Sequence, residues 1–202
     1  MFPKAILMKK RVLLSLLFCF LLFAGKSMAQ PLVGGKHEFG ALIGVQGAQF
    51  SADPSIDQSV KISVGGKLYW NYLLVGNLLS IRAEIGVDNW GTKMKSDTSL
   101  NLTYLTLPAV AAQVKFGPLK VYAGPQLNVL ISAKQKDGGS IDAKEFFKST
   151  DISGMVGAEV NLPFFIMLGA RYNFGFSNIS DVSEQNIKNG AFMAYVGVHF
   201  RR

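Results

Sequence analysis

The feature that most constrains this chain is an alternation of side chains with period two, which recurs along nearly all of it after residue 29. The clearest case is residues 164–177. One parity there is apolar throughout: Phe164, Ile166, Leu168, Ala170, Tyr172, Phe174 and Phe176. The opposite parity includes Gly169, Arg171, Asn173, Gly175 and Ser177. Because successive side chains of a β-strand point to opposite faces, this pattern predicts strands that each have one apolar face.

Seven further segments show the same alternation and are predicted to be strands: residues 38–50, 60–74, 79–88, 100–116, 121–132, 152–161 and 192–200. The segment 100–116 is the least regular, and we assign its inner face to Leu105, Leu107, Ala109 and Ala111. At about 10 residues each, such strands are long enough to cross a membrane at the usual tilt. The sequence therefore predicts an all-β domain of eight antiparallel strands.

The connections between these strands alternate in length, which gives the topology a direction. Short turns are expected at residues 75–77, 117–118 and 161–163, and longer polar segments at 51–59, 91–98, 135–150 and 179–189. Outer-membrane barrels have short periplasmic turns and longer external loops. We therefore expect an eight-stranded antiparallel up-and-down transmembrane β-barrel in a bacterial outer membrane, with four external loops and both termini periplasmic.

Residues 1–29 have the layout of a secretory signal peptide. Lys4, Lys9, Lys10 and Arg11 precede an apolar run over residues 12–24, and Ser27 and Ala29 supply small residues before a cleavage point. We expect cleavage after Ala29, which leaves residues 30–202 as the barrel domain, and either Met1 or Met8 as the start. The alternative is an N-terminal membrane anchor, for which the apolar run is short of the roughly 20 residues required.

Removal of this segment changes the charge balance. Five of the 21 Lys and Arg lie within it, so 16 remain against 13 acidic residues, and the net charge falls from +8 to +3. No block of basic residues survives, which argues against a nucleic acid partner. The single cysteine, Cys19, also lies there, so the mature chain has neither disulfides nor thiol chemistry.

The character of the two strand faces distinguishes a membrane barrel from a soluble one. The polar face is rich in Gly, Ser, Asn and Gln, which suits a crowded lumen better than a surface in water. Aromatic residues of the apolar face gather near strand ends, as interfacial girdles do: Phe39, Trp70, Tyr72, Tyr104, Phe116, Phe176 and Phe200. The alternative is a soluble, lipocalin-like barrel whose apolar face turns inward around a ligand.

Several short motifs together resemble the PorT-like outer membrane β-barrel domain family, which is common in Bacteroidota. They are Arg82-Ala83-Glu84 with Trp90-Gly91, Tyr104-Leu105-Thr106-Leu107-Pro108, Tyr122-Ala123-Gly124-Pro125, Arg171-Tyr172, Asn178-Ile179 and Lys188-Asn189. The resemblance covers essentially the whole mature chain and implies an outer-membrane barrel of this size; it implies no catalytic residues. The founding member is associated with protein secretion, a role that we do not transfer. One departure is that Arg201 and Arg202 follow Phe200, where the family's assembly signal ends on the aromatic residue.

Few residues suggest chemistry. His37 and His199 lie at the start of the first strand and the end of the last, so they are either a paired metal or catalytic site or, as we favour, two rim residues. Asp137-Gly138-Gly139-Ser140, with Asp142 and Glu145, lacks the ligand spacing of an EF-hand loop and is better explained as a turn. No helix follows Gly34-Gly35 or Gly65-Gly66, so they are not phosphate-binding loops. We therefore assign no catalytic, cofactor or metal site.

The candidate site is instead a group of charged residues on the lumen parity: Glu38, Lys67, Arg82, Glu84, Glu159 and Arg171. The interior of an eight-stranded barrel is just wide enough for its own side chains to fill. These charges are therefore expected to form a paired plug, with Glu84 and Glu159 as the leading partners of Arg171. The alternative is an ion path or a gate that exchanges partners.

These observations favour a non-enzymatic barrel with a structural or protein-interaction role, linked to secretion or another envelope function. The alternatives are a narrow pore for small solutes and, third, a membrane-embedded enzyme or the soluble binder. Expected partners are outer-membrane lipid, an envelope protein and the barrel-assembly machinery. Phe200, the terminal aromatic of an outward series, is the expected assembly signal.

Overall fold

The computed structural model of the chain describes residues 37–53, 58–75, 78–94, 98–136, 139–182 and 186–201. The expected signal peptide, Gly34-Gly35 and Asp137-Gly138 lie outside these residues. The elements in chain order are β1 (His37–Asp53), β2 (Gln58–Ser59), β3 (Lys61–Val75), β4 (Leu79–Met94), β5 (Ser99–Phe116), β6 (Leu119–Lys136), β7 (Ser140–Asp142), the 3-10 helix η1 (Lys144–Phe146), β8 (Thr150–Asn161), β9 (Ile166–Gly175) and β10 (Asn186–Arg201). No helix in these described ranges is both long and apolar enough to span a membrane.

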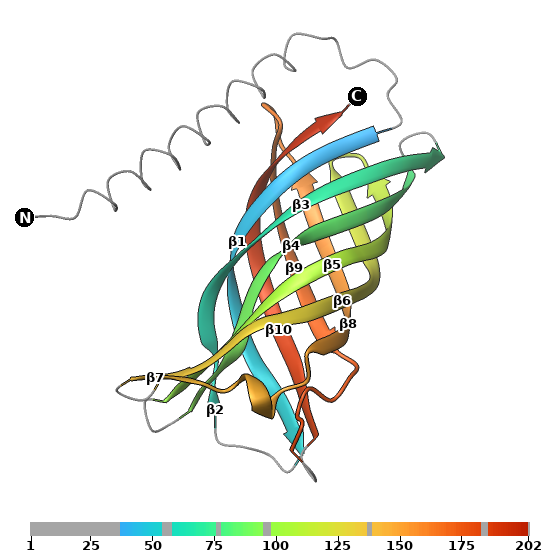
Figure 1. The fold of residues 1–202 in the computed structure, drawn as a ribbon. Coiled ribbons are helices and arrows are strands. Elements are labelled where there is room, and N and C mark those ends of the chain that lie inside the picture. Colours follow the sequence, from blue (N-terminus) through green and yellow to red (C-terminus); the bar gives the residue numbers. More distant parts are fainter. Residues whose placement is uncertain are drawn as a thin grey trace, which may run out of the picture. The chain divides into compact units, whose positions relative to one another are not determined.

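Within the described residues, eight long strands pair antiparallel and close into a barrel (Figure 1). Each pairs with the long strands before and after it in sequence, and β1 also pairs with β10, the last strand. At one end of the barrel, the short strand β2 pairs with the end of β4 and the short strand β7 pairs with the end of β6. This topology confirms the eight-stranded antiparallel up-and-down barrel predicted from the alternation.

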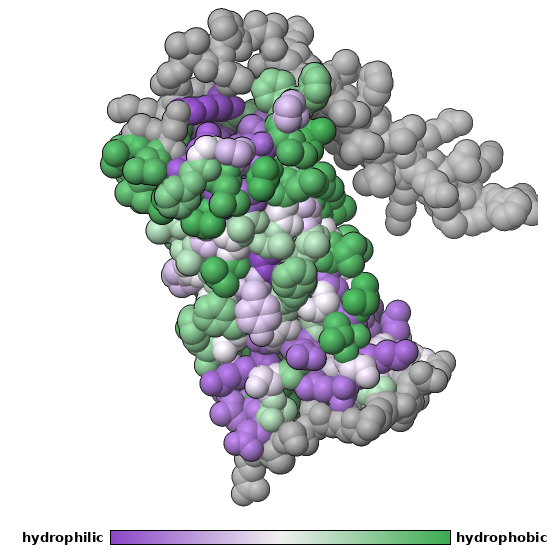
Figure 2. All heavy atoms as spheres, turned by 180° about the vertical axis from the view of Figure 1, so that it is seen from behind, coloured by the Kyte–Doolittle hydropathy of each residue, from purple (hydrophilic) through white to green (hydrophobic). Residues whose placement is uncertain are grey.

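The strand parity places apolar side chains outside and polar ones inside. Large hydrophobic residues such as Ile43, Leu68 and Val196 are exposed on the wall, whereas Arg82 and Arg171 are buried in the lumen. Hydrophobic residues cover much of the wall in Figure 2, and hydrophilic residues gather toward the end that carries β2 and β7. The lipocalin-like alternative, with its apolar face turned inward, is therefore wrong.

The predicted inner face of β5 is half wrong. Ala109 and Ala111 are buried inside, but Leu105 and Leu107 are partly exposed on the outer wall. The pairing of β5 with β6 shifts register between Leu107 and Ala112, and a β-bulge of this kind exchanges the faces of a strand. Tyr104 lies before this shift and is fully buried in the lumen, so its assignment to an interfacial girdle is also wrong.

Connections at the two ends of the barrel differ in length, but several strands run further than predicted. β4 continues to Met94 and β5 starts at Ser99, so residues 91–94 of the predicted long segment 91–98 are strand. The segment 135–150 contains β7 and η1. At the opposite end, β9 begins at Ile166 and not at Phe164, because Phe164 and Phe165 form the turn, both with φ of 63°.

Candidate functional site

The same parity that turns apolar side chains outward turns charged side chains into the lumen. The structure places all six charged residues singled out from the sequence there, buried: Glu38, Lys67, Arg82, Glu84, Glu159 and Arg171. Asp88 and Lys120 join them. Ion pairs connect these four basic and four acidic side chains, so the set carries no net charge. We call these eight residues the lumen network.

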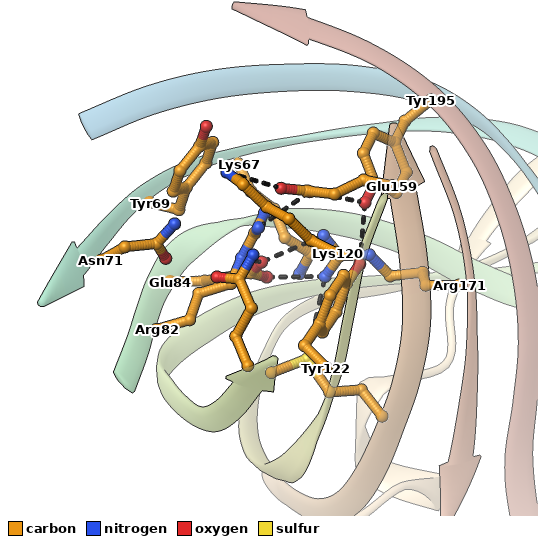
Figure 3. Close-up of polar contacts among 12 residues, drawn as sticks. Lys67, Tyr69, Asn71, Arg82, Glu84, Lys120, Tyr122, Glu159, Arg171 and Tyr195 are labelled. Carbon is orange, nitrogen blue, oxygen red and sulfur yellow. Dashed lines mark hydrogen bonds and ion pairs between the residues drawn. The ribbon is translucent and has the colours of Figure 1, made fainter. Parts of the chain in front are cut away.

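Arg171 of β9 and Glu84 of β4 face each other across the centre of this network (Figure 3). Arg171 Nη1 donates to Glu84 Oε2 at 2.6 Å and Nη2 donates to Oε1 at 3.1 Å. Such a two-point contact is the strongest form of an arginine–carboxylate pair. Arg82 Nε also donates to Glu84 Oε1, at 2.6 Å, so one carboxylate serves two guanidinium groups.

Glu159 of β8 is the second carboxylate at the centre. It accepts hydrogen bonds from Arg82 Nη1 at 2.8 Å and from the Tyr195 hydroxyl at 3.0 Å. Lys120 Nζ lies 3.4 Å from its other oxygen. Of the two partners expected for Arg171, the structure thus pairs Glu84 with it directly and pairs Glu159 with Arg82.

Three tyrosines enclose the guanidinium groups. The Arg82 guanidinium carbon lies 4.0 Å from the centre of the Tyr69 ring and 4.7 Å from that of Tyr122. Arg171 lies 5.2 Å from the Tyr195 ring, and the Tyr122 and Tyr195 hydroxyls are 2.9 Å apart. Cation–π contacts of this kind contribute roughly 0.5–2 kcal/mol each, most where water is excluded.

Two glycines make room for these rings. A Cβ atom at Gly157 would lie 2.4 Å from the Tyr122 ring, and one at Gly169 would lie 2.4 Å from the Tyr195 ring. Any larger residue would push a tyrosine away from the arginines. The small residues on the lumen parity therefore belong to the packing of the network.

The remaining pairs lie on either side of this centre. Lys67 Nζ donates to Asp88 Oδ2 at 2.5 Å and to Thr106 Oγ1 at 2.9 Å. Lys120 and Asn71 both donate to Glu38 Oε1, at 2.5 and 2.8 Å. Each charge thus has an opposite charge within reach, as a buried position requires.

An apolar cluster closes the lumen at the end that carries β7. Its buried members include residues of the strands and of the connections between them: Ala48, Phe50, Trp90, Leu100, Leu102, Tyr104, Leu130, Ala133, Ala143, Ile179 and Ala191. Ala143 precedes η1 and Ile179 follows β9, so two connecting segments fold over the barrel. Backbone hydrogen bonds join these segments, from Lys148 to Ile179 and from Asp181 to Phe146. We call this the apolar cap.

The two histidines lie on different faces of the wall. His37 is exposed and stacks on Trp70, with ring centres 5.8 Å apart. His199 pairs with Gly40, which shares the lumen parity of Glu38. Opposed residues of an antiparallel pair point to the same face, so the histidines do not converge on one site. Among the described residues, no group of three or more His, Cys, Asp or Glu could hold a metal ion.

Sequence reasoning missed Asp88 and Lys120. Asp88 stands on the lumen parity of its strand, with Arg82 and Glu84, and that parity was the available signal. Lys120 precedes the predicted start of its strand, which the structure extends to Leu119. Lys120 has the same strand parity as Tyr122, and that parity would have placed its side chain in the lumen.

Comparisons with known proteins agree with this geometry. Residues 16–200 match the family described as outer membrane protein beta-barrel domain. A comparison with curated proteins gave no match. The fold is similar to that of Ail, the attachment invasion locus protein of Yersinia pestis, in complex with the heparin analogue sucrose octasulfate, at 17% identity over 82% of this chain and 99% of that chain, with a TM-score of 0.51.

It is also similar to Neisserial surface protein A (NspA), at 19% identity over 80% of this chain and 97% of that chain, with a TM-score of 0.54. At such low identities the two structures show a shared fold alone.

Proposed function

Because the chain belongs to the outer membrane protein beta-barrel domain family, we propose that this outer-membrane protein is a closed barrel with a structural or protein-interaction role. The filled lumen carries this proposal. Eight paired charges occupy it, and the apolar cap closes one end. The functional surface is then outside the lumen.

We further propose that the apolar cap faces the cell exterior, with the short turns and both ends of the barrel domain in the periplasm. The usual arrangement of outer-membrane barrels supports this orientation. The end that carries β7 and η1 exposes large apolar side chains, Ile141 and Phe146, beside the exposed cations Lys134, Lys136 and Lys144. Such a mixed surface suits contact with another macromolecule better than a purely solvating face does.

The names of the two proteins of similar fold support a contact role at the cell surface, since one is an attachment invasion locus protein and the other a surface protein. The resemblance to the PorT-like branch of outer-membrane barrels rests on the short motifs given above and remains part of this proposal, as does a role in the cell envelope; the founding member's role in secretion is not transferred. Affinity capture from native outer membranes would identify an envelope partner.

Conductance of the purified protein tests the closed lumen. We expect no steady unit conductance when the barrel is inserted into a planar bilayer at moderate voltage. Gel mobility that changes on heating would show in parallel that the inserted protein is folded. A reproducible unit conductance from folded protein would refute the closed-barrel proposal.

A narrow, water-filled path is the second candidate, because some buried polar atoms are not used by the network. Neither amide atom of Asn173 has a partner among the described residues, and Arg171 Nε is also unpaired. Buried polar groups of this kind are commonly bridged by ordered water. The conductance measurement also decides this candidate, since a path for ions requires the charge pairs to separate.

A further inference from the structure

The outer wall carries a groove of about 320 Å³ on the face formed by β1, β3 and β4. Five of its lining residues point outward: Phe39, Leu68, Trp70, Ala83 and Ile85. The other two, Tyr69 and Glu84, alternate with them and direct their side chains into the lumen. The groove therefore belongs to the apolar exterior and is separate from the lumen network.

The strand register explains why a groove forms here. Phe39 opposes Trp70, and Trp70 opposes Ala83, so two large aromatic residues and one alanine form a single row across three strands. In the next row, Leu68 opposes Ile85. The methyl group of Ala83 leaves a gap between larger neighbours, and that gap is the floor of the groove.

One wall of the groove is held in place before any ligand arrives. Trp70 Nε1 donates to His37 Nδ1 at 3.1 Å, and the two rings stack. Tyr72 packs against both rings, with its ring centre 6.2 Å from that of Trp70 and 5.3 Å from that of His37. A preorganised wall reduces the ordering cost of binding.

We propose that this groove is a binding site for one acyl chain of a membrane phospholipid. Its outward lining is entirely apolar, its volume is at the lower end of the range for ligand pockets, about 300–1,000 Å³, and it lies on the outer wall, which the proposed function places against the membrane. A chain of methylene groups needs no polar partner, so the lining suits it.

The inference rests on the membrane-spanning role given above, and the experiment separates the two. The barrel is reconstituted in vesicles in which phospholipid with straight, brominated acyl chains replaces a rising fraction of a phospholipid with bulky, branched acyl chains. Bromine quenches tryptophan fluorescence on contact, and the W90F variant leaves Trp70 as the single tryptophan among the described residues, because Trp90 is buried in the apolar cap. Gel mobility confirms folding of each variant.

For an occupied groove we expect Trp70 quenching to saturate at a low brominated fraction. The reason is that the groove should prefer the brominated chain to the bulky, branched chain of the competing phospholipid. In Ala83→Phe the new ring fills the groove floor, so the fraction required for half-maximal quenching should rise at least about fivefold. Ala158→Phe is the matched control, because Ala158 is exposed on the outer wall of β8 and does not line the groove. It should behave like the parent.

Native mass spectrometry of detergent-purified protein gives a second measurement. One phospholipid should remain bound to the parent and to Ala158→Phe, and be lost from Ala83→Phe. If quenching rises in proportion to the brominated fraction and is the same in all variants, the site is refuted while the membrane location stands. If brominated chains do not quench Trp70 at all, the wall does not face the bilayer, and the proposed function fails together with the site.

Discussion

Replacement of Arg171 by alanine tests whether the lumen network holds the barrel together. Arg171 is 1% exposed and binds both oxygens of Glu84. Without it, Glu84 keeps Arg82 as a partner but loses its two-point contact. Removing one member of a buried pair typically costs ~3–5 kcal/mol. Because Arg82 remains, we expect a loss near ~3 kcal/mol in the free energy of unfolding.

The loss should be visible in thermal and chemical unfolding. For a domain of 150–250 residues, 1 kcal/mol corresponds to a shift in Tm of about 2–4 °C, so Arg171→Ala should lower Tm by roughly 6–12 °C. Urea titration in lipid vesicles, followed by gel mobility without heating, gives the free energy directly. The fraction of folded protein at zero urea shows whether the variant still assembles.

A double-mutant cycle identifies the partner. Arg171→Ala with Glu84→Gln and Arg171→Ala with Glu159→Gln both restore neutrality of the lumen network, so total charge is the same in the two doubles. Only the Glu84 double neutralises the carboxylate that Arg171→Ala leaves without its two-point partner, so it should recover part of the stability. Equal recovery by both doubles would show that charge balance matters and the pairing geometry does not. No recovery by the Glu84 double would refute the pair.

Three further predictions follow from the fold. Epitope tags inserted at Gly139 should be accessible on intact cells and tags at Gly117 should not; the reverse pattern would contradict the proposed orientation. Phe200→Ala, which removes the aromatic residue that stacks on Phe165 at 5.9 Å, should slow insertion measured as the appearance of heat-modifiable barrel, and an unchanged rate would eliminate Phe200 as an assembly signal. Gly169→Ala should destabilise the barrel by about 1–3 kcal/mol, because its methyl group overlaps the Tyr195 ring; Gly139→Ala, at a position with open space, is the control in the same urea titration and should change nothing.

Much of this structure was predictable because strand parity is a local property. The alternation at 164–177 and at 79–88 predicted Arg171, Arg82 and Glu84 on the lumen face, and the structure places all three there, buried. Parity failed in β5, where a bulge between Leu107 and Ala112 exchanges the faces, and the alternation itself carries no sign of that shift.

The partners within the lumen were less accessible to sequence reasoning. Arg171 and Glu84 are 87 residues apart, and Arg82 and Glu159 are 77 apart. Which side chains meet across a barrel depends on the stagger between strands, a property of the closed sheet. Parity therefore predicted the members of the network but could not choose between Glu84 and Glu159 as the partner of Arg171.

The pairing of charges across the lumen also disfavours a shifted strand register. A slip of one residue in β9 would turn Arg171 toward lipid, where an arginine at the bilayer midplane costs ~2–4 kcal/mol. The same slip would take from Glu84 its two-point partner inside the barrel. A misregistered sheet is thus penalised on both of its faces at once. Because the network joins strands from both halves of the chain, from β1 to β9, these penalties act in full only after β9 has paired in the sheet.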